Sequence, residues 1–189
     1  MIFGITGGTG CGKTTALEAL HSLGGVCLDC DAVYHDLLKT DKSLLAAIDG
    51  RFPGVVKAGQ LDRKALGSRV FADPAALADL NTITHAAVKQ KVLELLPKDD
   101  SPAAIDAIGL FESGLDRLCG VTVGILAPKA DRLRRIMVRD GIPEGYAQMR
   151  LDAQPEDGYF REKCDYILEN TGTEAEFRRK SLDFFQKFL

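Results

Sequence analysis

The chain has 189 residues, of which 46% are hydrophobic and 27% are charged, and its formal net charge is −3 at pH 7. This composition excludes a disordered chain, and the length suits one domain with small insertions and a sizeable core. The charge argues against a protein that binds nucleic acid through bulk electrostatics, and no apolar run approaches the roughly twenty residues that span a bilayer. We therefore expect a globular protein of the cytoplasm, a monomer or a small homo-oligomer, with no membrane or nucleic-acid partner.

A phosphate-binding loop follows the first predicted strand. Residues 1–6 form an apolar run typical of a buried parallel strand, and Gly7 to Thr14 matches the pattern G-x-x-x-x-G-K-[ST] at every fixed position. Glycines allow backbone N–H groups to surround phosphates, Lys13 brings a positive charge to them, and the Thr14 hydroxyl can bind Mg²⁺. Helical spacing over residues 14–23 places the loop at a helix N-terminus, which favours an anion. We predict a nucleoside triphosphate site. The residues expected to contact the nucleotide are Thr9, Gly10, Cys11, Gly12, Lys13, Thr14 and Thr15.

The five cysteines are an odd number and lie mostly within apolar runs, which favours buried free thiols. Cys27 and Cys30 form a C-x-x-C, but a zinc site needs a second pair of ligands and a redox motif should open a helix, so neither is favoured. Cys11 differs because it lies in the phosphate loop beside Lys13, where a thiolate is stabilised. We therefore hypothesise that Cys11 is sensitive to oxidation.

Two aspartates follow the second predicted strand, residues 26–28. A carboxylate at Asp29 or Asp31 could orient or deprotonate an acceptor hydroxyl, or hold a hydrated metal ion. Asp31 is also a good N-cap for a helix that begins at residue 32. The residues alone leave both interpretations of Asp31 open.

Residues 31–97 contain helical patterns and no convincing strand. The predicted helices cover residues 32–38, 42–51, 62–71 and 74–96, the last opened by Asp73-Pro74. This segment is too long for a simple crossover between parallel strands. We expect a helical insertion that binds a second substrate.

The strand pattern resumes at residues 103–108 and returns at 121–127 and 166–169, before a final helix over 174–189. Strands that alternate with helices predict an α/β fold with a parallel sheet covered on both faces. Asp106 and Glu112 flank the end of the third strand, where phosphate-loop enzymes often place a carboxylate for Mg²⁺. Asp106 is expected near the middle of that strand, which favours a structural role.

An arginine-rich segment follows Pro128. Arg132, Arg135 and Arg139 have the spacing i, i+3, i+7 and so share one face of a predicted helix, and Arg150 and Gln154 form an i, i+4 pair on a second helix over 144–153. A solvated basic face is the ordinary interpretation. The alternative is a lid that delivers cations to the γ-phosphate and excludes water.

The predicted fold class is therefore α/β, a P-loop NTPase fold with a five-stranded parallel sheet flanked by helices. A nucleotide-binding core covers residues 1–30, 98–127 and 164–189. A helical acceptor-binding insertion covers 31–97, and an arginine-rich helical lid covers 128–163.

A phosphate loop alone does not distinguish a GTPase, a motor ATPase and a small-molecule kinase. The Asn-Lys-x-Asp tetrapeptide that reads guanine is absent, because Asn170 is followed by Thr171, and a motor would be longer. The insertion and the arginine-rich helices fit a kinase that acts on a small acceptor. A kinase for a nucleotide or a sugar acid, and a non-enzymatic nucleotide-dependent switch, remain alternatives.

The chain resembles the dephospho-CoA kinase family along nearly its whole length. Apart from the phosphate loop, the matching stretches are residues 28–31, 61–67, 70–71, 80–85, 110–112, 139–141 and 164–170, with Arg150 and Gln154. The resemblance implies phosphorylation of the ribose 3′-hydroxyl of dephospho-CoA by ATP with Mg²⁺, the final step of coenzyme A synthesis. ATP and dephospho-CoA are then the expected small-molecule partners.

The resemblance also implies roles for single residues. Asp31 would be the catalytic carboxylate near the acceptor hydroxyl, Lys13 and Arg139 would complete the catalytic set, and Asn170 would lie near the adenine. The residues expected to bind the acceptor are Asp31, Arg63, Asn81 and His85. The chain departs from the family at Ala86, where proline usually follows the histidine, and at Ile108-Gly109, where Pro-Leu is usual. We expect the acceptor pocket to differ in shape there.

Overall fold

The computed structural model describes all residues, 1–189, and the chain forms two compact units. The first unit comprises Met1–Leu28 and Leu96–Leu189, and the second comprises Asp29–Leu95. The lid segment predicted over residues 128–163 belongs to the first unit. No helix combines the length and the apolar composition that crossing a membrane requires.

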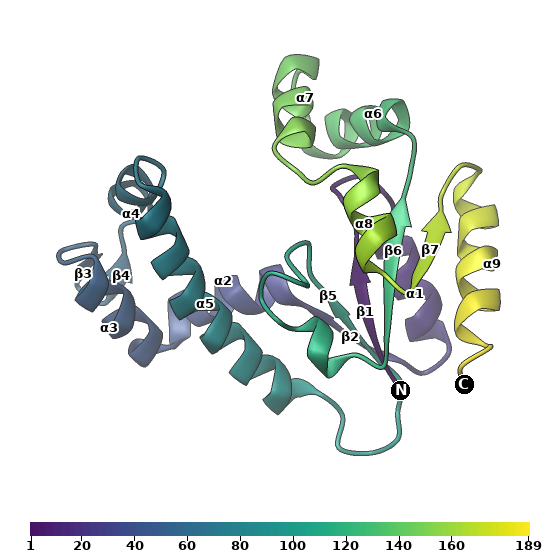
Figure 1. The fold of residues 1–189 in the computed structure, drawn as a ribbon, viewed down its shortest axis with the longest axis horizontal. Coiled ribbons are helices and arrows are strands. Elements are labelled where there is room, and N and C mark those ends of the chain that lie inside the picture. The colour runs from purple at the N-terminus through teal and green to yellow at the C-terminus, as the bar shows by residue number, and fades with distance from the viewer. The chain divides into compact units, whose positions relative to one another are not determined.

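The first unit is built on a five-stranded sheet with the order β2-β5-β1-β6-β7 (Figure 1). Its strands are β1 (Ile2–Thr6), β2 (Val26–Asp29), β5 (Ala103–Asp106), β6 (Val121–Leu126) and β7 (Tyr166–Glu169). β1 pairs in parallel with β5 and β6, and β6 pairs in parallel with β7. All six residues of β6 are buried, as expected for a central parallel strand covered on both faces. The predicted α/β fold with a five-stranded sheet is confirmed.

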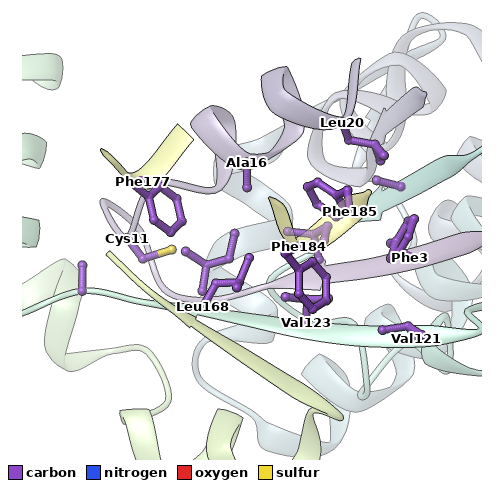
Figure 2. Close-up of a cluster of buried hydrophobic side chains, with 14 residues drawn as sticks. Phe3, Cys11, Ala16, Leu20, Val121, Val123, Leu168, Phe177, Phe184 and Phe185 are labelled. Atoms are coloured by element: carbon purple, nitrogen blue, oxygen red, sulfur yellow. The ribbon is translucent and has the colours of Figure 1, made fainter. Parts of the chain in front are cut away.

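The helices of the first unit are α1 (Lys13–Ser22), α6 (Lys129–Asp140), α7 (Glu144–Asp152), α8 (Asp157–Lys163) and α9 (Glu174–Phe185), with a 3₁₀ turn over Asp116–Leu118. Of these, α1, α8 and α9 pack on strands of the sheet, whereas α6 and α7 pack on each other. α1 and α9 pack together over a cluster that contains Phe3, Phe184 and Phe185 (Figure 2). α8 packs on β6 and β7. A Cβ added to Gly124 of β6 would lie 3.4 Å from the Cβ of Phe160 in α8. Neighbouring residues of a strand face opposite sides of the sheet, and Val123 faces the cluster under α1 and α9. Gly124 therefore faces the other side of the sheet, which α8 covers.

The second unit is mostly helical. Its elements are α2 (Cys30–Thr40), α3 (Lys42–Arg51), β3 (Val56–Lys57), β4 (Gln60–Leu61), α4 (Arg63–Val70) and α5 (Pro74–Leu95). Asp41 and Asp62 cap α3 and α4 through their carboxylates, and Pro74 begins α5, as its fixed φ allows. The long helix α5 packs against α2, α3 and α4 and so organises the unit.

The structure differs from the sequence-based expectations at the hairpin and the lid helices, and it decides the capping of α2. Residues 56–61 form an antiparallel hairpin, closed by Ala58 and Gly59 at positive φ, where no strand was expected. Asp29, not Asp31, caps α2, because its Oδ1 accepts hydrogen bonds from the N–H groups of Asp31 at 2.9 Å and Ala32 at 3.0 Å. The lid segment contains a third helix, α8, and α7 ends at Asp152, so Gln154 lies outside it.

Candidate active site

The phosphate loop connects the buried strand β1 to α1 and depends on glycine at two fixed positions. Gly7 has φ 141° and Gly12 has φ 103°, which L side chains rarely adopt. A Cβ on Gly7 would lie 2.3 Å from the Ile125 carbonyl oxygen, and one on Gly12 would lie 2.4 Å from Nδ2 of Asn170. Backbone conformation and close packing therefore both exclude a side chain at these positions.

α1 begins at Lys13, so the N–H groups of Lys13, Thr14 and Thr15 belong to its first turn and have no partner within the helix. Their dipoles and the helix dipole favour an anion in front of them. Thr14 is exposed and Thr15 half-buried. The loop thus presents the donors that a triphosphate requires.

The Lys13 side chain reaches back to the first residue of the phosphate loop, Gly7. Its Nζ donates a hydrogen bond to the Gly7 carbonyl at 3.1 Å and lies 3.9 Å from Oδ1 of Asp106. Asp106 is the last residue of β5, so its expected place near the middle of the strand was wrong, and its side chain is only 16% exposed. The sequence pattern favours a structural role for Asp106, yet its carboxylate lies beside the ammonium group of Lys13 in the phosphate loop.

Two of the three predicted lid arginines contact the loop itself. Arg132 Nε donates to the Thr9 carbonyl at 3.0 Å, and Arg135 Nη1 donates to the Gly10 carbonyl at 3.1 Å. Gln154 contacts Thr9 as well, through both ends of its amide. The shared helical face therefore brings Arg132 and Arg135 to the loop, although their partners are carbonyl oxygens.

Arg139 lies at the end of α6 with a different partner. It donates to both carboxylate oxygens of Asp140, at 2.7 and 3.0 Å, and Arg150 donates to the same carboxylate at 2.6 Å. Hydrogen bonds and charge from the two arginines lower the pKa of Asp140 to about 2. The Arg139 side chain is 58% exposed, and its hydrogen bonds go to Asp140 rather than to the phosphate loop.

Asn170 contacts the phosphate loop at Cys11. Asn170 follows β7, is buried, and donates from Nδ2 to the Cys11 carbonyl at 2.9 Å. Cys11 is 1% exposed and belongs to the cluster that contains Phe177 and Leu168 (Figure 2). Burial raises the pKa of the Cys11 thiol and outweighs the opposing charge of Lys13. The expectation of a thiolate at Cys11 was therefore wrong, because the side chain points into the core.

The remaining cysteines and Glu112 do not form a metal site. All five cysteines are free thiols, and burial raises the pKa of Cys27 to about 11. Glu112 accepts a hydrogen bond from the Tyr159 hydroxyl of α8, an interaction without any signal in the sequence. Nowhere in the chain do three His, Cys, Asp or Glu side chains gather closely enough to hold a metal ion.

The second unit carries the residues predicted for the acceptor. Asp31 is exposed in the first turn of α2, and Arg63 is exposed at the start of α4. Asn81 and His85 lie four residues apart on one face of α5, the former exposed and the latter half-buried. Burial raises the pKa of Tyr34 on α2, and the positive charge of Arg63 opposes this shift. The helices that carry all four residues pack within one unit.

Comparison with known proteins identifies relatives over the whole chain. The family model described as dephospho-CoA kinase matches residues 1–176. The dephospho-CoA kinase of Thermus thermophilus is 34% identical over 180 residues, which cover 95% of this chain and 87% of that protein. A solved structure from Thermus thermophilus has a TM-score of 0.84 at 32% identity and covers 100% of this chain and 97% of its own. The solved dephospho-CoA kinase from Campylobacter jejuni has a TM-score of 0.71 at 32% identity, over 99% and 96% of the two chains.

Proposed function

The chain belongs to the dephospho-CoA kinase family, and we infer from this membership that it phosphorylates dephospho-CoA with ATP to give coenzyme A and ADP, the last step of coenzyme A biosynthesis. The observation that carries the assignment is the match over residues 1–176, together with a phosphate loop whose Lys13 and helix N-terminus suit a triphosphate. The chain is therefore a transferase, with ATP and dephospho-CoA as its substrates.

On the donor side, we propose that Lys13 leaves the Gly7 carbonyl and binds the β- and γ-phosphates, while N–H groups from Gly10 to Thr15 surround them. Positioning and neutralisation of charge supply most of the catalysis in phosphoryl transfer. We also propose that Asn170 lies near the adenine, since it follows β7 and contacts the loop through the Cys11 carbonyl.

We propose that Mg²⁺ accompanies ATP. The Thr14 hydroxyl and the Asp106 carboxylate are hard oxygen ligands of the kind that Mg²⁺ prefers, and both belong to the first unit near the loop. Because no larger acidic cluster exists in the chain, phosphate oxygens and water would complete the coordination. When bound, the ion would neutralise charge that develops on the transferred group.

On the acceptor side, we propose that the insertion over residues 31–97, nearly all of which lies in the second unit, binds dephospho-CoA. Asp31 would orient the ribose 3′-hydroxyl and accept its proton as the oxygen attacks the γ-phosphorus and the bond to ADP breaks. The capping of α2 by Asp29 supports this role, because it leaves the Asp31 carboxylate without that structural task. Arg63, Asn81 and His85 are the proposed contacts to the rest of the acceptor.

The lid segment, residues 128–163, is proposed to close over the reacting groups and to bring Arg139 to the transferred phosphoryl. The exposure of the Arg139 side chain supports this proposal, because an exposed pair with Asp140 exchanges partners at little cost. We further propose a cytoplasmic enzyme that works as a monomer or a small homo-oligomer.

The activity is tested by ADP release with dephospho-CoA, AMP, shikimate and gluconate in parallel. We expect stimulation by dephospho-CoA alone, with a product that carries the new phosphate at the ribose 3′ position by ³¹P NMR. Stimulation by another acceptor would instead identify a different small-molecule kinase. ADP or ATP binding with no stimulation by any acceptor would identify a nucleotide-dependent switch.

A further inference from the structure

Every polar group of Thr9, at the tip of the phosphate loop, is held by two side chains from distant parts of the chain. The Thr9 N–H donates to Gln154 Oε1 at 2.8 Å, and Gln154 Nε2 donates to Thr9 Oγ1 at 2.6 Å. The Thr9 carbonyl accepts from Arg132 Nε at 3.0 Å. We propose that Gln154 and Arg132 form a clamp on Thr9, the Thr9 clamp, that keeps the loop in its phosphate-binding shape and makes its affinity for ATP depend on the lid. The inference rests on the proposed binding of ATP.

The clamp is a closed set of hydrogen bonds. Arg132 Nη2 also donates to Gln154 Oε1, at 3.1 Å, so the two side chains fix one another. Arg132 is only 7% exposed, and Asp157 is its carboxylate neighbour, with Oδ1 at 3.9 Å from Nη1. A buried guanidinium must satisfy its donors within the protein. Because these donors go to the loop and to Gln154, Arg132 acts as a positioning residue for the loop.

The glycines of the loop give independent support. Positions 8 and 10 are variable in the G-x-x-x-x-G-K-[ST] pattern, yet both are glycine in this chain. A Cβ on Gly8 would lie 2.0 Å from Arg132 Nη2, and one on Gly10 would lie 2.8 Å from the Arg132 carbonyl oxygen. Arg132 therefore packs closely against both glycines, and at Gly10 the positive φ of 80° adds a backbone requirement of its own.

The clamp also determines where the next N–H group points. In a planar trans peptide, the carbonyl and the following N–H point in opposite directions. Arg132 holds the Thr9 carbonyl, so the Gly10 N–H is directed away from Arg132, and Asn170 holds the Cys11 carbonyl and orients the Gly12 N–H in the same manner. Fixing these peptide planes before ATP arrives lowers the entropy lost on binding.

Both clamp residues come from the lid segment, residues 128–163. Arg132 lies in the first turn of α6, and Gln154 lies in the short connection between α7 and α8. Together they also line a cavity of about 480 Å³, bordered by Lys129, Leu151 and Asp157. Because this cavity lies beside Gln154, hydrogen bonds rather than dense packing hold its amide on the loop. A lid movement that withdraws Gln154 would release Thr9.

The test compares Gln154→Leu, which removes both amide groups, with Thr9→Val, which removes the hydroxyl and keeps the N–H. The matched control is Gln148→Leu, because Gln148 lies on α7 and donates to Asp152 instead of the loop. KM for ATP, kcat, the Kd of ADP by calorimetry and the melting temperature are measured for each protein. We expect Gln154→Leu to raise KM for ATP and the Kd of ADP about tenfold with kcat changed less than about threefold. The control should match the unsubstituted enzyme.

The double variant provides the sharpest readout, since residues that act through one another are not additive. We expect Thr9→Val to raise KM about threefold alone and to add nothing to Gln154→Leu. Unchanged KM and Kd in Gln154→Leu, or additive effects in the double variant, would overturn the clamp, as would a lower melting temperature with unchanged nucleotide affinity. Absence of ADP binding by the unsubstituted protein would overturn the ATP-dependent function itself, and the clamp with it.

Discussion

In the first unit, three consecutive carbonyls of the phosphate loop are held by Arg132, Arg135 and Asn170, and Lys13 is only 14% exposed. In the second unit, Asp31 and Arg63 are exposed at the starts of two helices. The donor side is thus organised before a substrate binds, whereas the acceptor side offers groups on helix surfaces. On the proposed assignment of ATP to the first unit and the acceptor to the second, ATP would bind a prepared site, while the order of the acceptor site would depend on the acceptor itself.

The largest effect on turnover is expected for the phosphate-loop lysine, Lys13. Lys13→Ala removes the charge that we assign to the β- and γ-phosphates, so kcat for ADP release should fall on the order of a thousandfold. Lys91→Ala, which removes a half-buried lysine paired with Glu94, is the control and should keep normal turnover. A loss below about tenfold in Lys13→Ala would show that the loop lysine does little in the reaction.

The rigidity of the donor side predicts a protected thiol. Cys11 is buried and its thiol pKa is raised, so the neutral, unreactive form dominates below pH 9 and alkylation requires a local opening. At pH 8, iodoacetamide should modify native Cys11 on the order of a hundredfold more slowly than the urea-unfolded chain. Peptide mass analysis follows the reaction, and equal rates in the two states would contradict a prepared loop.

A smaller effect is expected on the acceptor side. Arg63→Ala removes an exposed positive charge from the second unit, so KM for dephospho-CoA should rise about tenfold while the Kd of ADP stays unchanged. Arg69→Ala, an exposed arginine on the same helix, is the matched control. If Arg63→Ala weakens ADP binding as well, the assignment of donor and acceptor to different units is wrong.

The smallest effect is expected on the pKa of Asp140, which pairs with Arg139 at the end of α6. The pKa of Asp140 is lowered to about 2 in the folded state, so its contribution to stability is present above pH 4 and lost as the pH falls toward 2. NMR titration of Asp140 should show a higher pKa in Arg139→Ala, because Arg139 supplies the largest part of the shift. An unchanged pKa would mean that the two side chains do not pair in solution.

The sequence predicted the phosphate loop well because each of its positions has a separate local requirement. Gly12 must adopt positive φ and Lys13 must open a helix, and both conditions are visible within eight residues. The family resemblance was also correct, since ordered motifs along the whole chain carried it. The roles of Asp31 and Arg139 were expectations from that resemblance and remain predictions.

The parts that the sequence could not predict depend on contacts between distant residues or on small backbone differences. Thr9 and Gln154 are 145 residues apart, so no local pattern reveals their hydrogen bonds. Asp29 and Asp31 are equally good N-caps by residue type, and the extended backbone of Asp29 decides between them. The hairpin at residues 56–61 has strands of two residues, too short for alternation to show.

We propose that the first unit holds ATP and that Asp31 of the second unit activates the acceptor hydroxyl. The most direct measurement is kcat with dephospho-CoA together with the Kd of ATP in Asp31→Asn, an uncharged side chain of equal size. We predict that kcat falls about 10²- to 10⁴-fold while the Kd of ATP changes less than about threefold. Near-normal turnover, or a loss of ATP affinity that matches the loss of turnover, would contradict the catalytic role of Asp31.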